Sequence, residues 1–347
     1  MPDLYTDKGW LAAASIRGSC PTFTMITGGR GTGKTYGFLQ DLRVDNPAPF
    51  ILLRRTQAQV DMLSQQRFSP FRAIDRDRGC LTAVKKISKY VTGFYDGIED
   101  GDQVLPSGPP VAYALALSTV HNIRGFSAEV DYIIFDEFIP EPHERWITDE
   151  HTALLNAYET INRNRELEGR TPVKLIMLSN ANQLANPYYI GFGLVRQVDT
   201  MIRKGLTVWE DKDRDLMVIN LAGSPISEAK RETALYKLSA GSRFAGMALD
   251  NTFSSESRSR TGSWPLRELQ PLVCIGELCL YRHKSSRELY GSTHVSGSPI
   301  RYDTTDADIA RFRAKFGWTW EVYLDDRIVW QDYLPEILYR KFMGENY

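Results

Sequence analysis

The 347-residue chain lacks the cysteine pattern, the long apolar runs and the leader segment that mark several protein classes. Its four cysteines include no C-x2-C pair and have no histidine cluster beside them, which argues against a zinc site. Their scatter is more typical of a reducing cytosol than of a disulfide framework. No apolar run reaches the ~18–20 residues that span a bilayer, and the start of the chain does not read as a signal peptide. We therefore expect a soluble, intracellular protein.

Several catalytic signatures are missing too. The five histidines show no metal-ligand spacing, and the sequence contains no G-x-S-x-G nucleophile elbow and no kinase H-R-D motif. The formal net charge is −1, so any basic surface for nucleic acid must be local. The lack of an N-K-x-D sequence argues against guanine selection. The length suits two domains, or one large domain with an appendage.

The strongest signal is a glycine-rich loop that reads GGRGTGKT from Gly28 to Thr35 and fits the pattern G-x4-G-K-[ST]. It follows a β-rich segment, 22–27, and precedes a helical pattern over 36–42, which is the context that the motif requires. The glycines let backbone amides converge on phosphate oxygens. Lys34 would reach the β- and γ-phosphates, and the Thr35 hydroxyl would hold Mg²⁺. The alternative is a chance glycine-rich turn that opens a helix.

A second signal is the segment 133–137, which reads IIFDE and ends an apolar strand in two acids. Asp136 would lie beside the phosphate loop, where it could bind Mg²⁺ directly or through water. Glu137 would orient and activate the attacking water. A glutamate after the metal-binding aspartate favours an ATPase over a small GTPase. Taken alone, the segment is equally typical of an ordinary strand with an acidic turn.

A third polar position ends another predicted strand. The segment 173–180 reads VKLIMLSN, a buried type of strand that finishes at Asn180. The Asn180 side chain could hydrogen-bond the γ-phosphate or the attacking water, as the sensor residue of ring ATPases does. It could also be an ordinary polar residue of a strand-end turn.

Arginines are the candidates for neutralising charge in a phosphoryl-transfer transition state. Arg30 lies inside the loop and could contact the γ-phosphate of its own subunit. Arg163 and Arg165 belong to the helical pattern over 149–165 and could reach a neighbouring subunit's nucleotide, although arginines there also complement the helix dipole. Arg124 is a weaker candidate.

Basic residues also gather between positions 54 and 89. Such a patch could track a phosphate backbone, although a solvated face is the ordinary explanation of a charge run. A sparser basic set lies in the C-terminal half, from Arg258 to Arg287. The basic residues of the first patch are Arg54, Arg55, Arg67, Arg72, Arg76, Arg78, Lys85, Lys86 and Lys89.

Short apolar strands alternate with helical segments as far as residue 200. This pattern predicts an α/β fold with a mostly parallel sheet and helices on both faces. We expect a surface loop over 97–110, and a charged, partly helical character from residue 200 onward. Farther along, hairpin-like strands from Leu272, a helix over 306–317 and a last hairpin over 319–330 indicate a smaller α+β domain.

These segments resemble the DNA-packaging (encapsidation) ATPases of phi29-like bacteriophages. The resemblance rests on GGRGTGKTYGF, LLRR, VDYIIFDEFIPE, ALLNAYETINRNRE and LSNANQLANPYYIGFGL, which occur in this order from about residue 22. GMALDNTF, which ends at residue 253, extends it. The P-loop is common to very many proteins, whereas FDEFI and LSNA-x4-NPY are much more specific. The arginine in the loop also resembles that of the terminase large subunits, a wider clan of viral packaging motors.

The resemblance implies an ASCE-type P-loop ATPase domain over 1–200, a small linker domain over 201–245 and an RNase-H-like domain over 246–347. It implies a homomeric ring, commonly a pentamer, that docks on the portal of a procapsid in the host cytoplasm and is absent from the mature virion. The ring would use ATP and Mg²⁺ to drive double-stranded DNA inward. In phi29 relatives it also contacts a structural packaging RNA.

Carried over by position, Lys34 and Glu137 would be catalytic, and Arg163 would be the arginine that acts in trans. Thr35 and Asp136 would hold the metal. The residues expected to bind nucleotide are Gly28, Gly29, Arg30, Gly31, Thr32, Gly33, Lys34, Thr35, Asp136 and Asn180.

Two alternatives to a packaging ATPase with a silent C-terminal domain stay open. The first is a terminase-like enzyme with a working nuclease, which would need several acids around two metals. The predicted strands offer only Glu277, while Asp303, Asp306 and Asp308 resemble helix-capping acids. We therefore expect a vestigial nuclease that binds nucleic acid or the portal. The second alternative is a portal scaffold whose P-loop only binds nucleotide.

Overall fold

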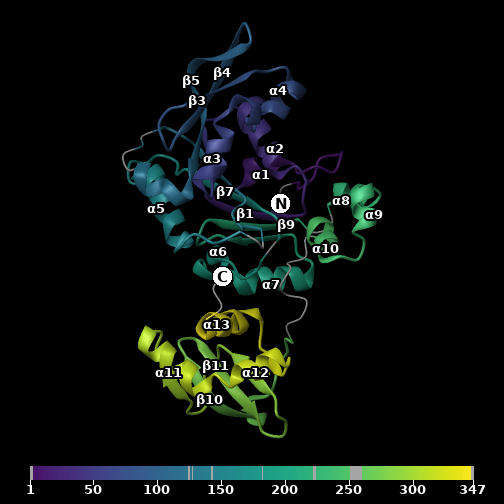
Figure 1. Cartoon of the computed structure of the whole chain (residues 1–347), viewed down its shortest axis with the longest axis vertical. Coiled ribbons are helices and arrows are strands. Elements are labelled where there is room, and N and C mark those ends of the chain that lie inside the picture. Colours follow the sequence, from purple (N-terminus) through teal and green to yellow (C-terminus); the bar gives the residue numbers. More distant parts are fainter. Residues whose placement is uncertain are drawn as a thin grey trace. The chain divides into compact units, whose positions relative to one another are not determined.

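The computed structural model describes residues 3–123, 126, 128–141, 144–181, 183–221, 224–250 and 260–344. Its contacts divide the chain into two compact units (Figure 1). The first unit comprises 1–183 and 201–254, and the second comprises 184–200 and 255–347. Arg124 and Arg258 lie outside the described residues. Within the described ranges, no helix is long and apolar enough to cross a membrane.

The first unit is built on one large sheet. Over the described residues, nine strands follow the order β3-β4-β5-β2-β6-β7-β1-β9-β8. The run from β5 to β9 is parallel, and β3, β4 and β8 add antiparallel edges. The predicted mostly parallel sheet is thus confirmed. The strands are β1 Phe23–Gly28, β2 Phe50–Arg54, β3 Thr82–Lys86, β4 Thr92–Asp100, β5 Gln103–Ala116, β6 Tyr132–Asp136, β7 Lys174–Ser179, β8 Val208–Asp211 and β9 Leu216–Leu221.

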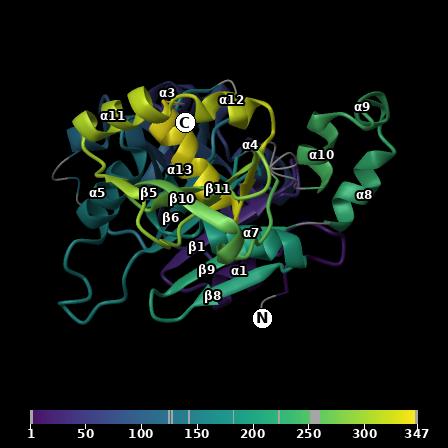
Figure 2. The same cartoon turned by 90° about the horizontal axis from the view of Figure 1, so that it is seen from below.

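Helices connect these strands. α2 continues into a π-helical turn, Asp41–Asp45, and short 3-10 helices occupy Gln66–Phe68 and Leu117–Ile123. α8, α9 and α10 group together in both views (Figures 1 and 2). The helices of this unit are α1 Ala13–Ser19, α2 Lys34–Gln40, α3 Gln57–Leu63, α4 Arg72–Arg78, α5 Glu150–Asn162, α8 Pro225–Arg231, α9 Ala234–Leu238 and α10 Arg243–Asp250.

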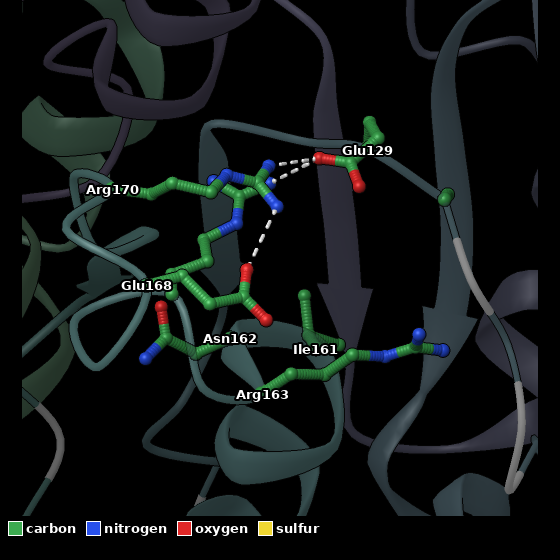
Figure 3. Close-up of a pocket in the computed structure, with 8 residues that line it drawn as sticks. Glu129, Ile161, Asn162, Arg163, Glu168 and Arg170 are labelled. Carbon is green, nitrogen blue, oxygen red and sulfur yellow. Dashed lines mark hydrogen bonds and ion pairs between the residues drawn. The ribbon is translucent and has the colours of Figure 1, made fainter.

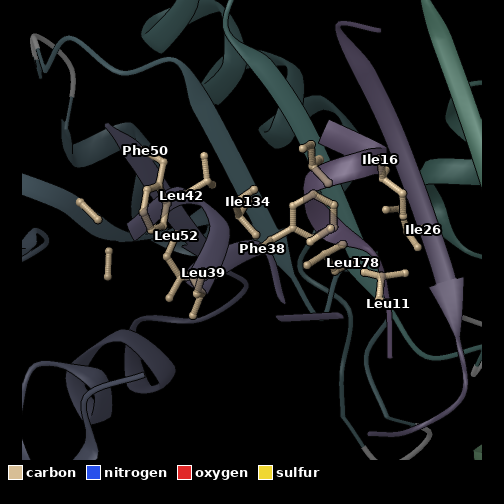
Figure 4. Close-up of a cluster of buried hydrophobic side chains, with 14 of the residues drawn as sticks. Leu11, Ile16, Ile26, Phe38, Leu39, Leu42, Phe50, Leu52, Ile134 and Leu178 are labelled. Atoms are coloured by element: carbon tan, nitrogen blue, oxygen red, sulfur yellow. The ribbon is translucent and has the colours of Figure 1, made fainter. Parts of the chain in front are cut away.

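The core fixes α2 against the sheet, and so fixes the loop that precedes it. Phe38 of α2 is fully buried and lies among Ile26 of β1, Ile134 of β6 and Leu178 of β7 (Figure 4). Burying one such side chain contributes on the order of 1.5–3 kcal/mol. These neighbours come from three adjacent strands. Packing against one face of α2 therefore fixes the position of this helix over β6, β7 and β1.

Two expectations for this unit are wrong. Residues 97–110 were expected to be a loop, but they form the arms of the β4–β5 hairpin, where Ile98 faces Leu105. Prolines and glycines suggested the loop, yet an edge hairpin tolerates them because one side of the strand needs no partner. Residues 208–221 fall in the predicted linker domain 201–245, but they are the strands β8 and β9 of the large sheet. Within that segment, residues 201–204 and the part from Pro225 onward contain the helices.

The second unit has a five-stranded sheet over the described residues, in the order β13-β10-β11-β12-β14. β10, β11 and β12 form an antiparallel meander, while β13 and β14 add parallel edges. Three helices lie on one face of β10 and β11 (Figure 2). The elements are α6 Pro187–Gly191, β10 Leu269–Ile275, β11 Leu278–His283, β12 Leu289–Ser292, β13 Ile300–Tyr302, α11 Asp306–Phe316, α12 Thr319–Leu324, β14 Ile328–Trp330 and α13 Tyr333–Met343. α7, Val195–Lys204, spans the division between the units, and a 3-10 helix covers Leu266–Glu268.

Two further expectations are corrected in this unit. The hairpin predicted over 319–330 is instead a helix followed by one edge strand, because Val322 and Trp330 both turn into the same apolar core. Cys274 and Cys279 form a disulfide, although the cysteines were not expected to pair. The two residues face each other across β10 and β11 with their Cα atoms 4.1 Å apart, so the hairpin itself brings the thiols together. The RNase-H-like character of this unit stays a prediction.

Candidate nucleotide site

The glycine loop needs its glycines for conformation and for space. Gly31 and Gly33 have φ angles of 62° and 85°, in the left-handed region that side chains disfavour. A Cβ atom on Gly29 would lie 2.5 Å from the carbonyl oxygen of Ala248. The loop therefore follows a path open to glycine, from the end of β1 to the start of α2, and this path is what a phosphate cradle requires.

Lys34 is a buried cation, with only 8% of its surface exposed. Its Nζ atom donates to the carbonyl oxygens of Gly28 and Gly29 at 2.8 Å, and to Oδ1 of Asn180 at 3.2 Å. Burial lowers the pKa of Lys34 to about 7, the nearby cations Arg30 and Lys230 act in the same direction, and the acids oppose the shift. A buried amine without a full counter-charge favours an anionic ligand.

Thr35 and Asp136 meet at the carboxyl edge of the sheet. The hydroxyl of Thr35 donates to Oδ1 of Asp136 at 2.7 Å, and Asp136 is buried at the end of β6. These two oxygens are hard donors of the kind that Mg²⁺ prefers. Among the described residues, no group of three or more Asp, Glu, His or Cys side chains is placed to hold a metal by itself. Mg²⁺ usually binds through one or two protein oxygens with phosphate and water completing its shell, so this pair fits it.

Glu137 follows β6 with a φ of 57°, an uncommon backbone angle that turns its carboxylate toward Arg54. Arg54, at the end of β2, binds both acids: its Nη2 is 3.0 Å from Oδ2 of Asp136, and its Nη1 is 2.9 Å from Oε2 of Glu137. Burial raises the pKa of Glu137, and the Arg54 charge opposes this rise. The sequence pattern had assigned Arg54 only to the basic patch. Its place after a buried strand, next to β6 in the sheet, is the signal that could have found it.

The P-loop, the end of β6 and Asn180 line one cavity of about 360 Å³, which we call the phosphate cavity. Seven predicted nucleotide or catalytic side chains line it: Arg30, Thr32, Lys34, Thr35, Asp136, Glu137 and Asn180. Arg30 also pairs with Glu141 at 2.5 Å, so its guanidinium is already held by an acid. Gly31 and Gly33 contribute backbone, whereas Gly28 and Gly29 touch the site through the carbonyls that accept from Lys34.

Known proteins match this chain in sequence and in fold. Residues 103–261 match the family model of the podovirus DNA encapsidation protein, Gp16. The DNA packaging protein of Bacillus phage phi29 is 31% identical over 182 residues, which cover 50% of this chain and 51% of that protein. The DNA packaging protein of Bacillus phage PZA is 32% identical over 181 residues, 50% of each chain. A solved structure, the Phi-28 gp11 DNA packaging motor, matches at 19% identity with a TM-score of 0.62, covering 99% of this chain and 100% of that one.

The chain is similar to the phage DNA-packaging proteins. The resemblance expected from the sequence motifs is thereby confirmed, and the motor structure confirms the α/β fold. The chain spans about half the length of the curated packaging proteins that it matches. The family match includes Asp136, Glu137 and Arg163 but begins after the P-loop, so the loop stands on its own geometry.

Arg163 and Arg165, the two arginines predicted to reach a neighbouring subunit's nucleotide, differ in environment. Arg165 is buried and pairs with Glu129 at 3.1 Å and with Asp131 at 3.8 Å, which suits a structural role. Arg163 closes α5 with a φ of 53° and donates from Nη2 to the carbonyl oxygen of Phe126 at 2.9 Å. Figure 3 shows the Arg163 guanidinium pointing away from the ion pairs that Glu129 makes. Among the described residues that line the phosphate cavity, Arg163 is absent; it lines a separate pocket with Glu129 and Glu168.

The outer side of the P-loop is held by a segment far along the chain. The amide of Arg30 donates to the carbonyl oxygen of Ala248 in α10 at 2.9 Å. Lys230 of α8 donates from Nζ to the carbonyl oxygens of Arg30 and Gly31, at 2.6 and 2.8 Å. Sequence reasoning missed Lys230, because nothing in the local pattern of α8 points to a partner two hundred residues earlier.

The basic patch over 54–89 is not one surface. Arg54 binds Asp136 and Glu137, which line the cavity. Arg55 is buried against Glu150, with Nε and Nη2 at 2.7 and 3.0 Å from its carboxylate oxygens. Several others pair with acids, among them Arg78 with Asp45. Arg76 pairs with Asp77 and Lys86 with Asp61. The exposed basic residues of this stretch that lie outside these pairs are Arg67, Arg72, Lys85 and Lys89.

Proposed function

We propose that this chain is the ATP-hydrolysing subunit of a phage motor that drives double-stranded DNA into a procapsid. The observation that carries the proposal is the convergence of Lys34, the Thr35–Asp136 pair and Glu137 on one cavity at the carboxyl ends of β1 and β6. The names of the matched proteins supply the link to DNA packaging. The protein would act in the host cytoplasm, at the portal of the procapsid.

In this proposal, each side chain has one task. Lys34 exchanges its contacts with the carbonyls of Gly28 and Gly29 for oxygens of the β- and γ-phosphates. Thr35 and Asp136 hold Mg²⁺, which neutralises charge on the phosphates. Asn180, already 3.2 Å from Lys34 Nζ, hydrogen-bonds the γ-phosphate or the attacking water.

Glu137 is the general base that accepts a proton from the attacking water at a carboxylate oxygen. Arg54 now binds that carboxylate at Oε2, which keeps its negative charge paired. Catalysis therefore requires Arg54 to release Glu137 while it retains Asp136. Glu137 would then have two states, one in which its carboxylate is paired with Arg54 and one in which it can accept a proton.

The subunits would form a ring, of five copies by analogy with the phage motors, and Arg163 would act on the neighbour's nucleotide. Support comes from its place outside the cavity of its own chain and from its single described partner, a backbone carbonyl that costs little to leave. Rings mixed from Arg163→Ala and Glu137→Gln subunits should regain turnover, because one interface then has both groups. Assembled mixed rings without turnover would count against the trans role.

The second unit would bind nucleic acid or the portal without cutting DNA. Two of its acids are engaged in local bonds: Asp308 Oδ2 accepts from the amide of Asp303, and Asp303 Oδ1 accepts from the amide of Thr304. Thr305, rather than an acid, caps α11. The rival nuclease predicts Mg²⁺- or Mn²⁺-dependent DNA cleavage that Asp303→Asn removes.

The deciding experiment is ATP hydrolysis measured with and without double-stranded DNA, alongside the mass of the assembled particle. We expect DNA to raise the rate of a ring. A ring that binds ATP but shows no turnover with DNA would instead support the alternative of a portal scaffold whose P-loop only binds nucleotide.

A further inference from the structure

Two backbone carbonyls on the outer side of the P-loop are held by a distant lysine. Lys230 of α8 donates from Nζ to the carbonyl oxygens of Arg30 and Gly31, at 2.6 and 2.8 Å. Hydrogen bonds from a charged donor are roughly twice as strong as neutral ones. Among the described residues that line the phosphate cavity, Lys230 is absent, so its amine contacts the loop from outside that cavity.

The peptide bond converts this outer contact into an orientation on the inner side. In a trans peptide the carbonyl and the following amide point in nearly opposite directions, and none of the described peptide bonds is cis. The carbonyl of Arg30 shares its peptide unit with the amide of Gly31, and the carbonyl of Gly31 shares its unit with the amide of Thr32. Holding both carbonyls outward therefore turns these two amides toward the phosphate cavity, which Gly31 and Thr32 line.

The two amides are available to a ligand. Over the described part of the chain, neither the Gly31 amide nor the Thr32 amide has a hydrogen-bond acceptor, and Thr32 is fully buried. A buried N–H group without an acceptor is unfavourable, and a phosphate oxygen would satisfy it. The left-handed φ of 62° at Gly31 also belongs to the kind of turn in which successive amides form a concave anion site.

The close approach of the lysine depends on the glycine and on a fixed helix. A Cβ atom on Gly31 would lie 2.2 Å from Nζ of Lys230, so a side chain there would displace the amine. α8 contacts α10, and the carbonyl oxygen of Ala248 in α10 accepts from the amide of Arg30 at 2.9 Å. The loop is thus held from the same side by two helices, and Lys230 supplies the charged part of that contact.

We propose that Lys230 is a positioning residue for phosphate binding, which holds the carbonyls of Arg30 and Gly31 outward so that the amides of Gly31 and Thr32 bind the phosphates of ATP. The inference rests on the proposed function, because it takes the triphosphate to lie on the P-loop. Lys230 has no contact with the reacting atoms in this assignment. Removing its ammonium group should therefore weaken the capture of phosphate and leave the chemical step intact.

The test measures binding and turnover separately. Calorimetry gives the affinity of the full chain for ATP and for inorganic tripolyphosphate, each with Mg²⁺, and steady-state hydrolysis with DNA gives kcat and KM. Lys230→Met keeps the apolar stem and removes the donors. We expect it to bind both ligands about tenfold more weakly and to raise KM by a similar factor, with kcat within about threefold of the wild type. Lys230→Arg keeps a charged donor and should recover most of the affinity.

A matched control is Lys237→Met, because Lys237 belongs to the neighbouring helix α9 and pairs on the surface with Glu232 at 3.0 Å. It should change none of these quantities. Unchanged affinity of Lys230→Met for both ligands would overturn the inference. A loss confined to kcat would overturn it too, and so would equal weakening in Lys230→Met and Lys230→Arg, which would show that the side chain only supports the packing of α8.

A second variant covers the case in which Lys230→Met does not fold. Lys230→Gln keeps an N–H donor without the charge, and it should weaken the binding of both ligands by about threefold or more. Unchanged affinities in that variant would count against the positioning role. A wild-type chain that binds neither ATP nor tripolyphosphate would instead refute the proposed function.

Discussion

The two units treat buried charge differently. The first buries charged side chains, among them Lys34, Asp136 and the pair Arg55–Glu150, whereas the described part of the second buries a single charged residue, Glu336. Burying an ion costs several kcal/mol unless partners compensate it, so charge is retained inside a protein where it has a structural or chemical task. In the first unit, Lys34 and Asp136 line one cavity at the carboxyl edge of a parallel sheet. The difference indicates that chemistry belongs to the first unit and that the second is held together mainly by apolar packing.

Removing the buried amine should have the largest effect. Lys34→Ala deletes the cation that faces the phosphates, and we expect ATP binding and hydrolysis to fall below detection. The fold should survive, because the substitution also removes a desolvated charge whose pKa is lowered to about 7. Calorimetry with ATP and thermal melting of the same sample check both statements. Full activity in this variant would refute the site.

The sequence was sufficient where a short, contiguous pattern carries the chemistry. The P-loop is eight residues with a strand before it and a helix after it, and Asp136 ends an apolar run that could only be a buried strand. It was not sufficient where partners are distant. Arg54 and Glu137 are 83 residues apart and meet because β2 and β6 are neighbours in the sheet. Lys230 likewise reaches the loop through the tertiary fold.

Local propensity also failed where packing decided the outcome. Residues 97–110 contain prolines and glycines that predict a loop, yet pairing with the rest of β4 and β5 extends them as a hairpin. Residues 319–330 alternate in a way that suggests strands, but the apolar core of the second unit takes Val322 from a helix. The disulfide depends on the register that places Cys274 opposite Cys279, which spacing alone does not define.

The next effect tests the proposed base. Glu137→Gln keeps the shape of the side chain but cannot accept a proton, so turnover should fall by about 10²–10⁴ while ATP binding remains. The matched control in the second unit is Glu277→Gln, at the exposed turn between β10 and β11, and it should leave the rate unchanged. Steady-state hydrolysis and ATP affinity are measured on both variants. Equal losses in the two would contradict the assignment of chemistry to the first unit.

The third effect concerns stability. Glu150→Gln leaves the Arg55 guanidinium buried beside a neutral amide, and removing one partner of such a pair costs about 3–5 kcal/mol of unfolding free energy. Glu228→Gln breaks an exposed pair with Arg231 and should cost less than about 1 kcal/mol. Denaturant unfolding gives the two values, and hydrogen exchange shows which unit opens. Similar small values for both variants would mean that the buried pair is not a stabilising contact of the first unit.

The smallest effect tests whether the second unit depends on packing alone. A Cβ atom on Gly291 would lie 2.1 Å from Cε3 of Trp330, which is buried in the apolar core of that unit. Gly291→Ala should therefore displace the indole and cost about 1–3 kcal/mol of unfolding free energy. Gly262→Ala is the control in the same unit, because its Cβ atom would make an ordinary contact of 3.5 Å with Val329. Neither variant should alter ATP hydrolysis by the isolated chain. A loss of hydrolysis in Gly291→Ala, with the first unit intact by hydrogen exchange, would show that the apolar unit also contributes to the chemistry.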